Sequence, residues 1–341
     1  DARESSITKN VEEIWEGVKG VRFFDHFCLC TDDREADDIL HVGHMNDVVR
    51  TAIRSGMDPV TAIKSATFNT AREIHIENLG AIAPGYVADM LIVSDLRELK
   101  PDYVFFGGKL VAEMGQMSVP IEDREYPLEK VNTMYVRELT EEDFRIKAPV
   151  ENGTVTVHVM EYPDIHLSST ELTTAQLPVK DGYVCLEGED LKFVAVVNRH
   201  KGHDTIGLGI VKGFGTTCGA LASTVSHDSH NLTVVYDSAA NALAAAKALI
   251  QCGGGMSAVK DGRLLHVLEL PLAGLISLKD AAELAKDSQA MKEANRELGL
   301  TGLENPLLRI VTLALPVIPK VKMSDLGMVD VLKKELIPLF A

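Results

Sequence analysis

The amino-acid sequence predicts a mixed protein in which an α/β part is followed by an α+β part. In the first part, a strand pattern over Val21–Thr31 is followed by a charged loop and then by apolar positions at helical spacing. In the second part, strand patterns such as Leu191–Val197 alternate with helix patterns at Ala239–Ile250 and Ala281–Leu298. The chain has 341 residues, more than a typical single domain, so we expect more than one domain.

The first elements are short and are bounded by turn residues. An amphipathic pattern predicts a helix over Ile7–Gly17, ahead of Val21–Thr31, whose Phe, Val, Leu and Cys side chains predict a buried strand. Asp58 and Pro59 have the residue types of a helix N-cap and first turn, so a helix should begin there.

A small β unit is expected next. Leu79–Ile82 and Ala88–Val93 read as short strands separated by turn residues. Gly107–Gly108 can supply the positive φ angles of a tight hairpin between Val104–Phe106 and Leu110–Val111.

The second part follows a charged connector. The stretch from Pro120 to Pro149 has no sustained helix or strand period. A hairpin is expected from Met256–Val259 and Leu264–Leu268 around the Asp261-Gly262 turn. Further strands are expected at three places: Thr154–Met160, Ile206–Val211 and, as a last core strand, Ile310–Val317.

The composition disfavours several classes of partner. The 50 acidic and 34 basic side chains give a net charge of -16, which repels phosphates and anionic lipids, so we expect neither a nucleic-acid nor a membrane partner. The five cysteines form no CxxC pair, and no apolar run is long enough to span a membrane. We therefore expect a cytoplasmic protein with reduced thiols.

The histidines are candidates for a metal or catalytic site. Three pairs are spaced three residues apart: His41 and His44, His200 and His203, His227 and His230. This spacing places two imidazoles on one face of a helix but on opposite faces of a strand, so each pair can equally be a loop feature. The polar run from His227 to Asn231 is the densest and follows a strand pattern, which favours a site there.

Asp32 is the sharpest single candidate, because it directly follows the predicted Val21–Thr31 strand. The carboxyl end of a buried barrel strand is where α/β-barrel enzymes build their active sites. There a carboxylate can bind a metal or take a proton from water. The alternatives are helix capping and a salt bridge with Arg34 in the charged loop.

Several motifs carry a family resemblance. Cys30–Asp33, Gly43–Arg50 and Asp58–Arg72 resemble the end of an amidohydrolase-superfamily barrel, and Leu79–Val93 resembles the segment where such enzymes leave the barrel and complete a small β domain. Within the superfamily, the second half resembles the extra C-terminal domain of adenine deaminases. The motifs that carry this second resemblance are Asn198–His200, Gly202–His203, Gly213–Gly215, Gly219–Thr224, His227–Asn231 and Pro271–Leu275.

The resemblance implies a fold and an activity. Residues 1–74 would be the C-terminal end of a metal-dependent (β/α)8 barrel, 75–118 a small β domain, 119–170 a connector with β segments and 171–341 an α+β C-terminal domain. The family reaction converts adenine and water to hypoxanthine and ammonia with a divalent metal such as Mn, Fe or Zn. By resemblance Asp32 would be metal ligand and proton acceptor, and the substrate or lid candidates would be Asp33, His44, His227 and His230.

The resemblance also shows that metal ligands typical of the superfamily are missing from this sequence. Amidohydrolases bind metal through an HxH pair on the first barrel strand, and no two histidines here are separated by a single residue. We therefore expect an incomplete portion that is inactive alone, with the N-terminal barrel part on another chain or absent, and a homo-oligomeric protein. The alternatives are another amidohydrolase acting on a cyclic amide or amidine, and a non-catalytic assembly fragment.

Overall fold

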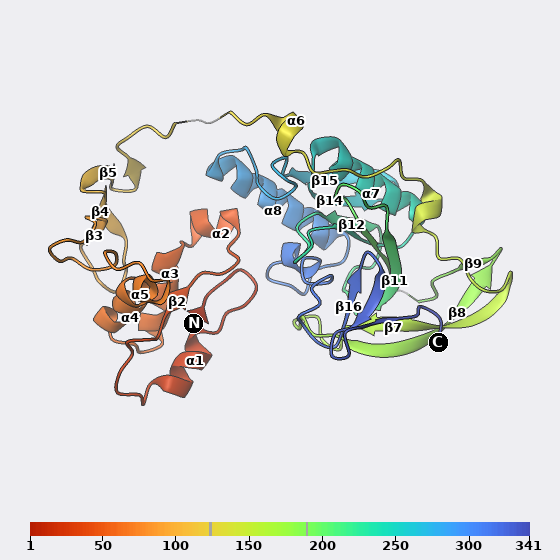
Figure 1. The fold of residues 1–341 in the computed structure, drawn as a ribbon, viewed down its shortest axis with the longest axis horizontal. Helices are drawn as coiled ribbons and strands as arrows, with labels where there is room; N and C mark the ends of the chain where they lie inside the picture. The colour runs from red at the N-terminus through yellow and green to blue at the C-terminus, as the bar shows by residue number, and fades with distance from the viewer. Residues whose placement is uncertain (123–124, 189) are drawn as a thin grey trace. The chain divides into compact units, whose positions relative to one another are not determined.

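The computed structural model describes residues 1–122, 125–188 and 190–341. In this described part the chain separates into two compact units, Asp1–Glu125 and Tyr126–Ala341 (Figure 1). Both units contain helices and strands, so the expected mixed α/β character is confirmed. No helix in the described ranges is both long and apolar enough to cross a membrane.

The first unit begins with a strand, a helix and a second strand. The strands β1 and β2 pair in parallel, with Ala2 opposite Leu29 and Arg3 opposite Cys30. A small core packs helices onto this pair, and its members include Trp15, Leu29 and Val48. The elements up to the end of the helical region are β1 (Ala2–Arg3), α1 (Val11–Val18), β2 (Leu29–Cys30), α2 (Ala36–His41), α3 (Met45–Arg54), α4 (Pro59–Ala66) and α5 (Phe68–Glu73).

The predicted start of helix α4 is confirmed. Asp58 is its N-cap, and the carboxylate accepts a hydrogen bond of 3.0 Å from the backbone N–H of Thr61. Pro59 stands in the first turn, where its missing N–H costs no hydrogen bond.

The predicted long strand over Val21–Thr31 is wrong, because only Leu29–Cys30 is a strand. The aromatic residues of this run form a local cluster instead. The Phe24 ring lies 5.5 Å from that of Trp15 on α1, and Phe27 packs edge-on against Phe24. Phe23 is 69% exposed, so the run is not uniformly buried as a core strand would be.

A small antiparallel sheet completes the first unit. The predicted glycine hairpin is confirmed, since Gly107 and Gly108 have positive φ and join two neighbouring strands. The predicted strand over Leu79–Ile82 is wrong: Gly80 has a φ of +83°, and a Cβ there would lie 2.7 Å from the backbone of Phe68. The strands are β3 (Met90–Val93), β4 (Pro101–Phe106), β5 (Lys109–Glu113) and β6 (Gln116–Met117), in that order across the sheet.

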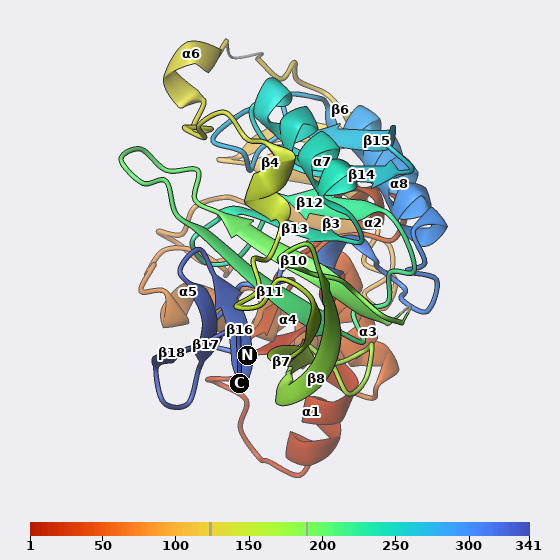
Figure 2. The same ribbon diagram turned by 90° about the vertical axis from the view of Figure 1, so that its right-hand side faces the viewer.

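The second unit is built on one large mixed sheet (Figure 2). Its strand order is β15-β14-β12-β13-β10-β11-β7-β8-β9. Neighbouring strands run antiparallel except β7 and β11, which are parallel. The bounds are β7 (Gly153–Glu161), β8 (Glu171–Lys180), β9 (Tyr183–Val184), β10 (Leu191–Val197), β11 (Ile206–Lys212), β12 (Ala220–Ser223), β13 (Leu232–Tyr236), β14 (Gly255–Lys260) and β15 (Arg263–Glu269).

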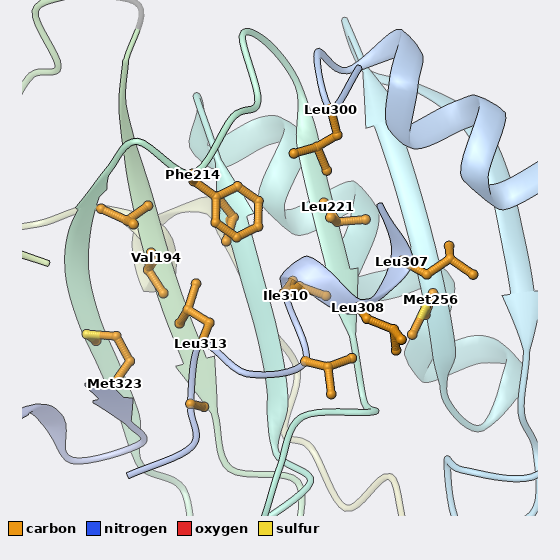
Figure 3. Close-up of a cluster of buried hydrophobic side chains, with 14 of the residues drawn as sticks. Val194, Phe214, Leu221, Met256, Leu300, Leu307, Leu308, Ile310, Leu313 and Met323 are labelled. Carbon is orange, nitrogen blue, oxygen red and sulfur yellow. The ribbon is translucent and has the colours of Figure 1, made fainter. Parts of the chain in front are cut away.

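Alternate residues of the central strands face two different cores. Ala195 and Val197 of β10 belong to a core with the Ala-rich helix α7 (Ala239–Cys252). Val194 and Val196 face the other core, which includes helix α8 (Ala281–Glu297) and the chain that follows it (Figure 3). The predicted helices at Ala239–Ile250 and Ala281–Leu298 are thereby confirmed, one on each face of the sheet.

Short elements surround the large sheet. A small antiparallel sheet closes the chain, and short helices precede the large sheet and follow α8. These elements are α6 (Leu128–Val131), the 3-10 helices η1 (Glu141–Phe144) and η2 (Leu307–Arg309), and strands β16 (Val321–Ser324), β17 (Gly327–Asp330) and β18 (Glu335–Ile337).

The predicted core strand over Ile310–Val317 is wrong, because these residues form turns with local hydrogen bonds, such as Leu313 N–H to the Ile310 carbonyl. Ile310 and Leu313 are fully buried nonetheless. Apolar residues that are buried in turns therefore produced the same sequence pattern as a buried strand. The strand predicted at Thr154–Met160 is confirmed as β7, which pairs along its whole length with β8.

Candidate active-site residues

Asp32 follows β2 after a single intervening residue, as predicted. It has a φ of +53°, and its Oδ1 accepts a hydrogen bond of 2.9 Å from the backbone N–H of Asp33. The side chain is 32% exposed. The carboxylate is therefore open to water.

The partner of Asp32 is Arg3, whose Nη1 donates to Asp32 Oδ2 in an ion pair. The parallel pairing of β1 with β2 places Arg3 opposite Cys30, close to where Asp32 leaves the strand. The sequence analysis missed Arg3, since 29 residues separate the two side chains and no local motif links them.

Arg34, the sequence-level alternative partner of Asp32, binds elsewhere. Its Nη2 lies 2.7 Å from Oδ2 of Asp47, which is buried, and its Nη1 donates to the Glu4 carbonyl. Arg50 adds a second contact to Asp47 at 3.3 Å. This buried cluster fixes helix α3 to the loop after β2, so Arg34 has a structural role here.

The other first-unit candidates are near the same loop in sequence. Asp33 is exposed, and its backbone carbonyl accepts a hydrogen bond from Ser6 N–H. His44 is exposed and is the N-cap residue of α3, where its backbone N–H donates to the Asn46 side chain. His41 ends α2, so the His41 and His44 pair does not share one helix face.

The second-unit candidates meet at one end of the large sheet. Val197 at the end of β10 pairs with Leu232 at the start of β13, and Ser223 at the end of β12 pairs with the neighbouring Thr233. The loop that follows β10 and the loop from β12 to β13 therefore lie at the same sheet end. Glu269, which ends β15, pairs there with the start of β14.

Arg199 holds these loops together. Its side chain is buried, and its guanidinium donates to the carbonyls of His230 and Ala273 and to the Thr133 hydroxyl. Burial lowers the pKa of Arg199 to about 10, which leaves it charged at neutral pH. A buried cation thus stabilises the ends of three loop segments.

The histidine pair His227 and His230 lies beside Arg199. The two rings are 5.4 Å apart and nearly perpendicular, and His200 Nε2 lies 2.7 Å from the Ser229 carbonyl. The pKa of His230 is lowered mainly by burial and, to a smaller extent, by the nearby His227. The lower pKa favours a neutral ring. The structure therefore gathers three of the sequence-predicted histidines at one sheet end.

The donor side chains of residues 1–122, 125–188 and 190–341 do not form a metal cage. Within the described ranges, no three His, Cys, Asp or Glu side chains gather in a way that could hold a metal ion. Asp32 has one oxygen bonded to Arg3 and the other to the Asp33 N–H. A divalent ion would therefore need ligands beyond the described residues.

Two protein families match different parts of this chain. Residues 1–111 match the amidohydrolase family, and residues 168–335 match the adenine deaminase C-terminal domain. Most of the first unit is thus similar to one family model, and most of the second unit is similar to another.

Individual relatives agree with this assignment. The chain is 42% identical over 314 residues to an adenine deaminase of Moorella thermoacetica, which covers 91% of the chain and 52% of that protein. It is 37% identical to adenine deaminase 2 of Carboxydothermus hydrogenoformans and 38% identical to an adenine deaminase of Geobacillus kaustophilus, with 99% of the chain and 58% of each relative covered. The chain is therefore similar to adenine deaminases along nearly its whole length, and it spans somewhat more than half the length of these relatives.

Proposed function

We propose that this chain is part of an adenine deaminase, an enzyme that hydrolyses adenine to hypoxanthine and ammonia in purine salvage. The observation that carries the proposal is the identity of 37–42% to proteins of that name along 91–99% of the chain. The adenine deaminase C-terminal domain match over residues 168–335 supports adenine over other amidohydrolase substrates.

The first unit supports a place at the end of a (β/α)8 barrel. The order β1, α1, β2 with parallel strands is the βαβ unit from which such barrels are built. In this proposal residues 1–74 end the barrel, 75–118 form the small β domain, 119–170 connect and 171–341 form the C-terminal domain. The candidate Asp32 then stands at the carboxyl end of a barrel strand.

Asp32 is the proposed catalytic residue. An exposed carboxylate can accept the proton of a water molecule that attacks the amidine carbon of adenine, and ammonia leaves once its nitrogen is protonated. A divalent ion, Mn, Fe or Zn, is proposed as the cofactor with Asp32 as one ligand and the remaining ligands outside the described residues.

The other candidates are proposed to bind substrate or to cover it. Asp33 and His44 are exposed near Asp32 in sequence, and His227 and His230 belong to the loop cluster that Arg199 holds. The proposed partner is adenine or a related small molecule, in a cytoplasmic homo-oligomer. The five cysteines, all free in the structure, support a reducing compartment.

Fragment complementation tests the proposal. The chain is purified alone and together with the portion of the Moorella thermoacetica relative that it does not cover, and hypoxanthine is measured from adenine with Mn²⁺. We expect hypoxanthine from the pair and none from the chain alone. Hydrolysis of dihydroorotate in place of adenine would favour another amidohydrolase, and a stable but inactive pair would favour an assembly role.

A further inference from the structure

Arg3, the ion-pair partner of Asp32, has no role in the proposed reaction beyond that contact. It is the last residue of β1, and Asp32 follows β2, so both side chains leave the carboxyl ends of two parallel strands. In α/β-barrel enzymes the substrate binds at the carboxyl ends of the strands. Arg3 therefore lies where a substrate of Asp32 has to lie.

The backbone around Arg3 is tied to the segment that carries the proposed catalytic carboxylate. Next to Arg3, the N–H of Glu4 donates to the Cys30 carbonyl at 3.3 Å. Further along, the N–H of Ser6 donates to the Asp33 carbonyl at 2.8 Å. These hydrogen bonds hold the chain after β1 beside the chain after β2, so the guanidinium starts from a defined position.

The guanidinium of Arg3 has hydrogen-bond donors that a ligand can reach. Its Nη1 donates to Asp32 Oδ2, and a guanidinium carries several further N–H donors. The Arg3 side chain is 42% exposed, so these donors are open to solvent and not enclosed by protein. The planar fork of an arginine can donate two parallel hydrogen bonds to two acceptors that lie side by side.

The proposed reaction creates such a pair of acceptors on the purine. Adenine has an amino group at C6, which is a donor, beside the acceptor N7. Hydrolysis forms a bond from C6 to the water oxygen and breaks the bond from C6 to the amino nitrogen; one water proton ends on N1 and the other leaves with ammonia. The C6 oxygen and N7 are then neighbouring acceptors, the pair that arginine binds on guanine.

We propose that Arg3 binds N7 of the purine and the oxygen that C6 gains. This inference rests on the proposed adenine deaminase activity. A carboxylate has about four lone-pair sites, so Asp32 can hold Arg3 and still accept a proton. Because the contact to the oxygen forms only as the amino group is replaced, it stabilises the transition state more than the bound substrate and raises turnover.

Kinetics with adenine and 7-deazaadenine test the proposal in a chimera in which this chain replaces the matching segment of the Moorella thermoacetica relative. Arg3→Lys keeps the charge beside Asp32 but loses the planar fork, and the control is Arg97→Lys at an exposed turn position. We expect Arg3→Lys to lower kcat for adenine about tenfold or more with KM within about threefold, and the control to match the parent. The preference for adenine over 7-deazaadenine, which lacks the N7 acceptor, should fall at least about threefold in Arg3→Lys only.

Calorimetry with hypoxanthine gives a readout that needs no turnover. We expect Arg3→Lys to weaken hypoxanthine about tenfold and to leave purine, which has no oxygen at C6, within about threefold. Parent values of kcat and substrate preference in Arg3→Lys, equal weakening of both ligands, or no binding of hypoxanthine to the parent chimera would each overturn the proposal. A parent chimera that forms no hypoxanthine from adenine but binds hypoxanthine through Arg3 would contradict the proposed function and support this inference.

Discussion

Replacement of the buried lysine Lys322 should change how the stability of the second unit depends on pH. Lys322 on β16 is fully buried, and its Nζ donates to the Ser168 carbonyl at 2.5 Å. No carboxylate among the described residues forms an ion pair with it. The pKa of Lys322 is lowered to about 7, mainly by burial and to a smaller extent by the nearby Arg309 guanidinium.

The pKa gives the sign and size of the effect. The ordinary lysine pKa of 10.5 and the value of about 7 correspond to a cost of about 5 kcal/mol when the amine is charged in both states, at about 1.4 kcal/mol per pH unit. That full cost applies below pH 7. Between about pH 7 and 10.5 the unfolded chain binds more protons than the folded chain, so the free energy of unfolding rises with pH.

The test compares wild type with Lys322→Met by urea unfolding between pH 6 and 10, followed by far-ultraviolet circular dichroism. Met cannot titrate, so its stability advantage over wild type should shrink by about 2 kcal/mol from pH 7 to 9. Lys201→Met, at an exposed loop position, is the control and should show no such change. The fluorescence of Trp15, which lies in the first unit, should report the same unfolding midpoint in all three proteins.

A difference between wild type and Lys322→Met that stays constant from pH 6 to 10 would refute this reasoning. It would mean that the amine keeps its ordinary pKa in the folded chain.

Three further outcomes are expected. Arg199→Met should speed hydrogen exchange of the amides from His227 to Asn231 about tenfold or more, because the guanidinium bonds the His230 carbonyl; unchanged exchange would contradict this role. Asp58→Ala should destabilise the first unit by about 1 kcal/mol in urea unfolding followed by Trp15 fluorescence, through loss of the α4 cap, whereas an unchanged midpoint would argue against it. Calorimetry with Mn²⁺, Fe²⁺ or Zn²⁺ should show no tight stoichiometric binding to the chain alone, because the described residues gather too few metal ligands. Tight binding that is lost in His227→Ala would show that this chain does supply enough ligands.

Helices and strands whose apolar residues recur at a regular spacing could be predicted from the sequence. Helices α7 and α8 and strand β10 have the expected positions, because each has an apolar pattern that matches its own period and ends at a cap or turn residue. The Asp58 cap could also be predicted, since its chemistry is local.

Apolar runs without a clear period were misread. Val21–Thr31 and Ile310–Val317 are rich in residues that favour strands, but the first packs its rings on Trp15 and the second folds into buried turns. Burial alone does not distinguish a strand from a packed loop.

The candidate site shows the same limit. The position of Asp32 after a strand could be predicted from chain order, but its pairing with Arg3 depends on the parallel contact of β1 and β2. The role of Arg199 likewise arises from loops that are distant in sequence and meet at one sheet end. Such contacts have no local signal in a single sequence.

The central claim is that this chain supplies the catalytic carboxylate Asp32 to an adenine deaminase. The most direct measurement is hypoxanthine formation from adenine by a chimera in which this chain replaces the matching segment of the Moorella thermoacetica relative, tested with Asp32→Asn and with the control Asp89→Asn. Asp89 accepts a hydrogen bond from the Gly107 N–H, which Asn can also accept. We predict an active chimera whose turnover falls at least about 100-fold in Asp32→Asn and stays near the parent value in Asp89→Asn, with both variants folded. Near-normal turnover in Asp32→Asn, or a folded chimera that forms no hypoxanthine, would contradict the claim.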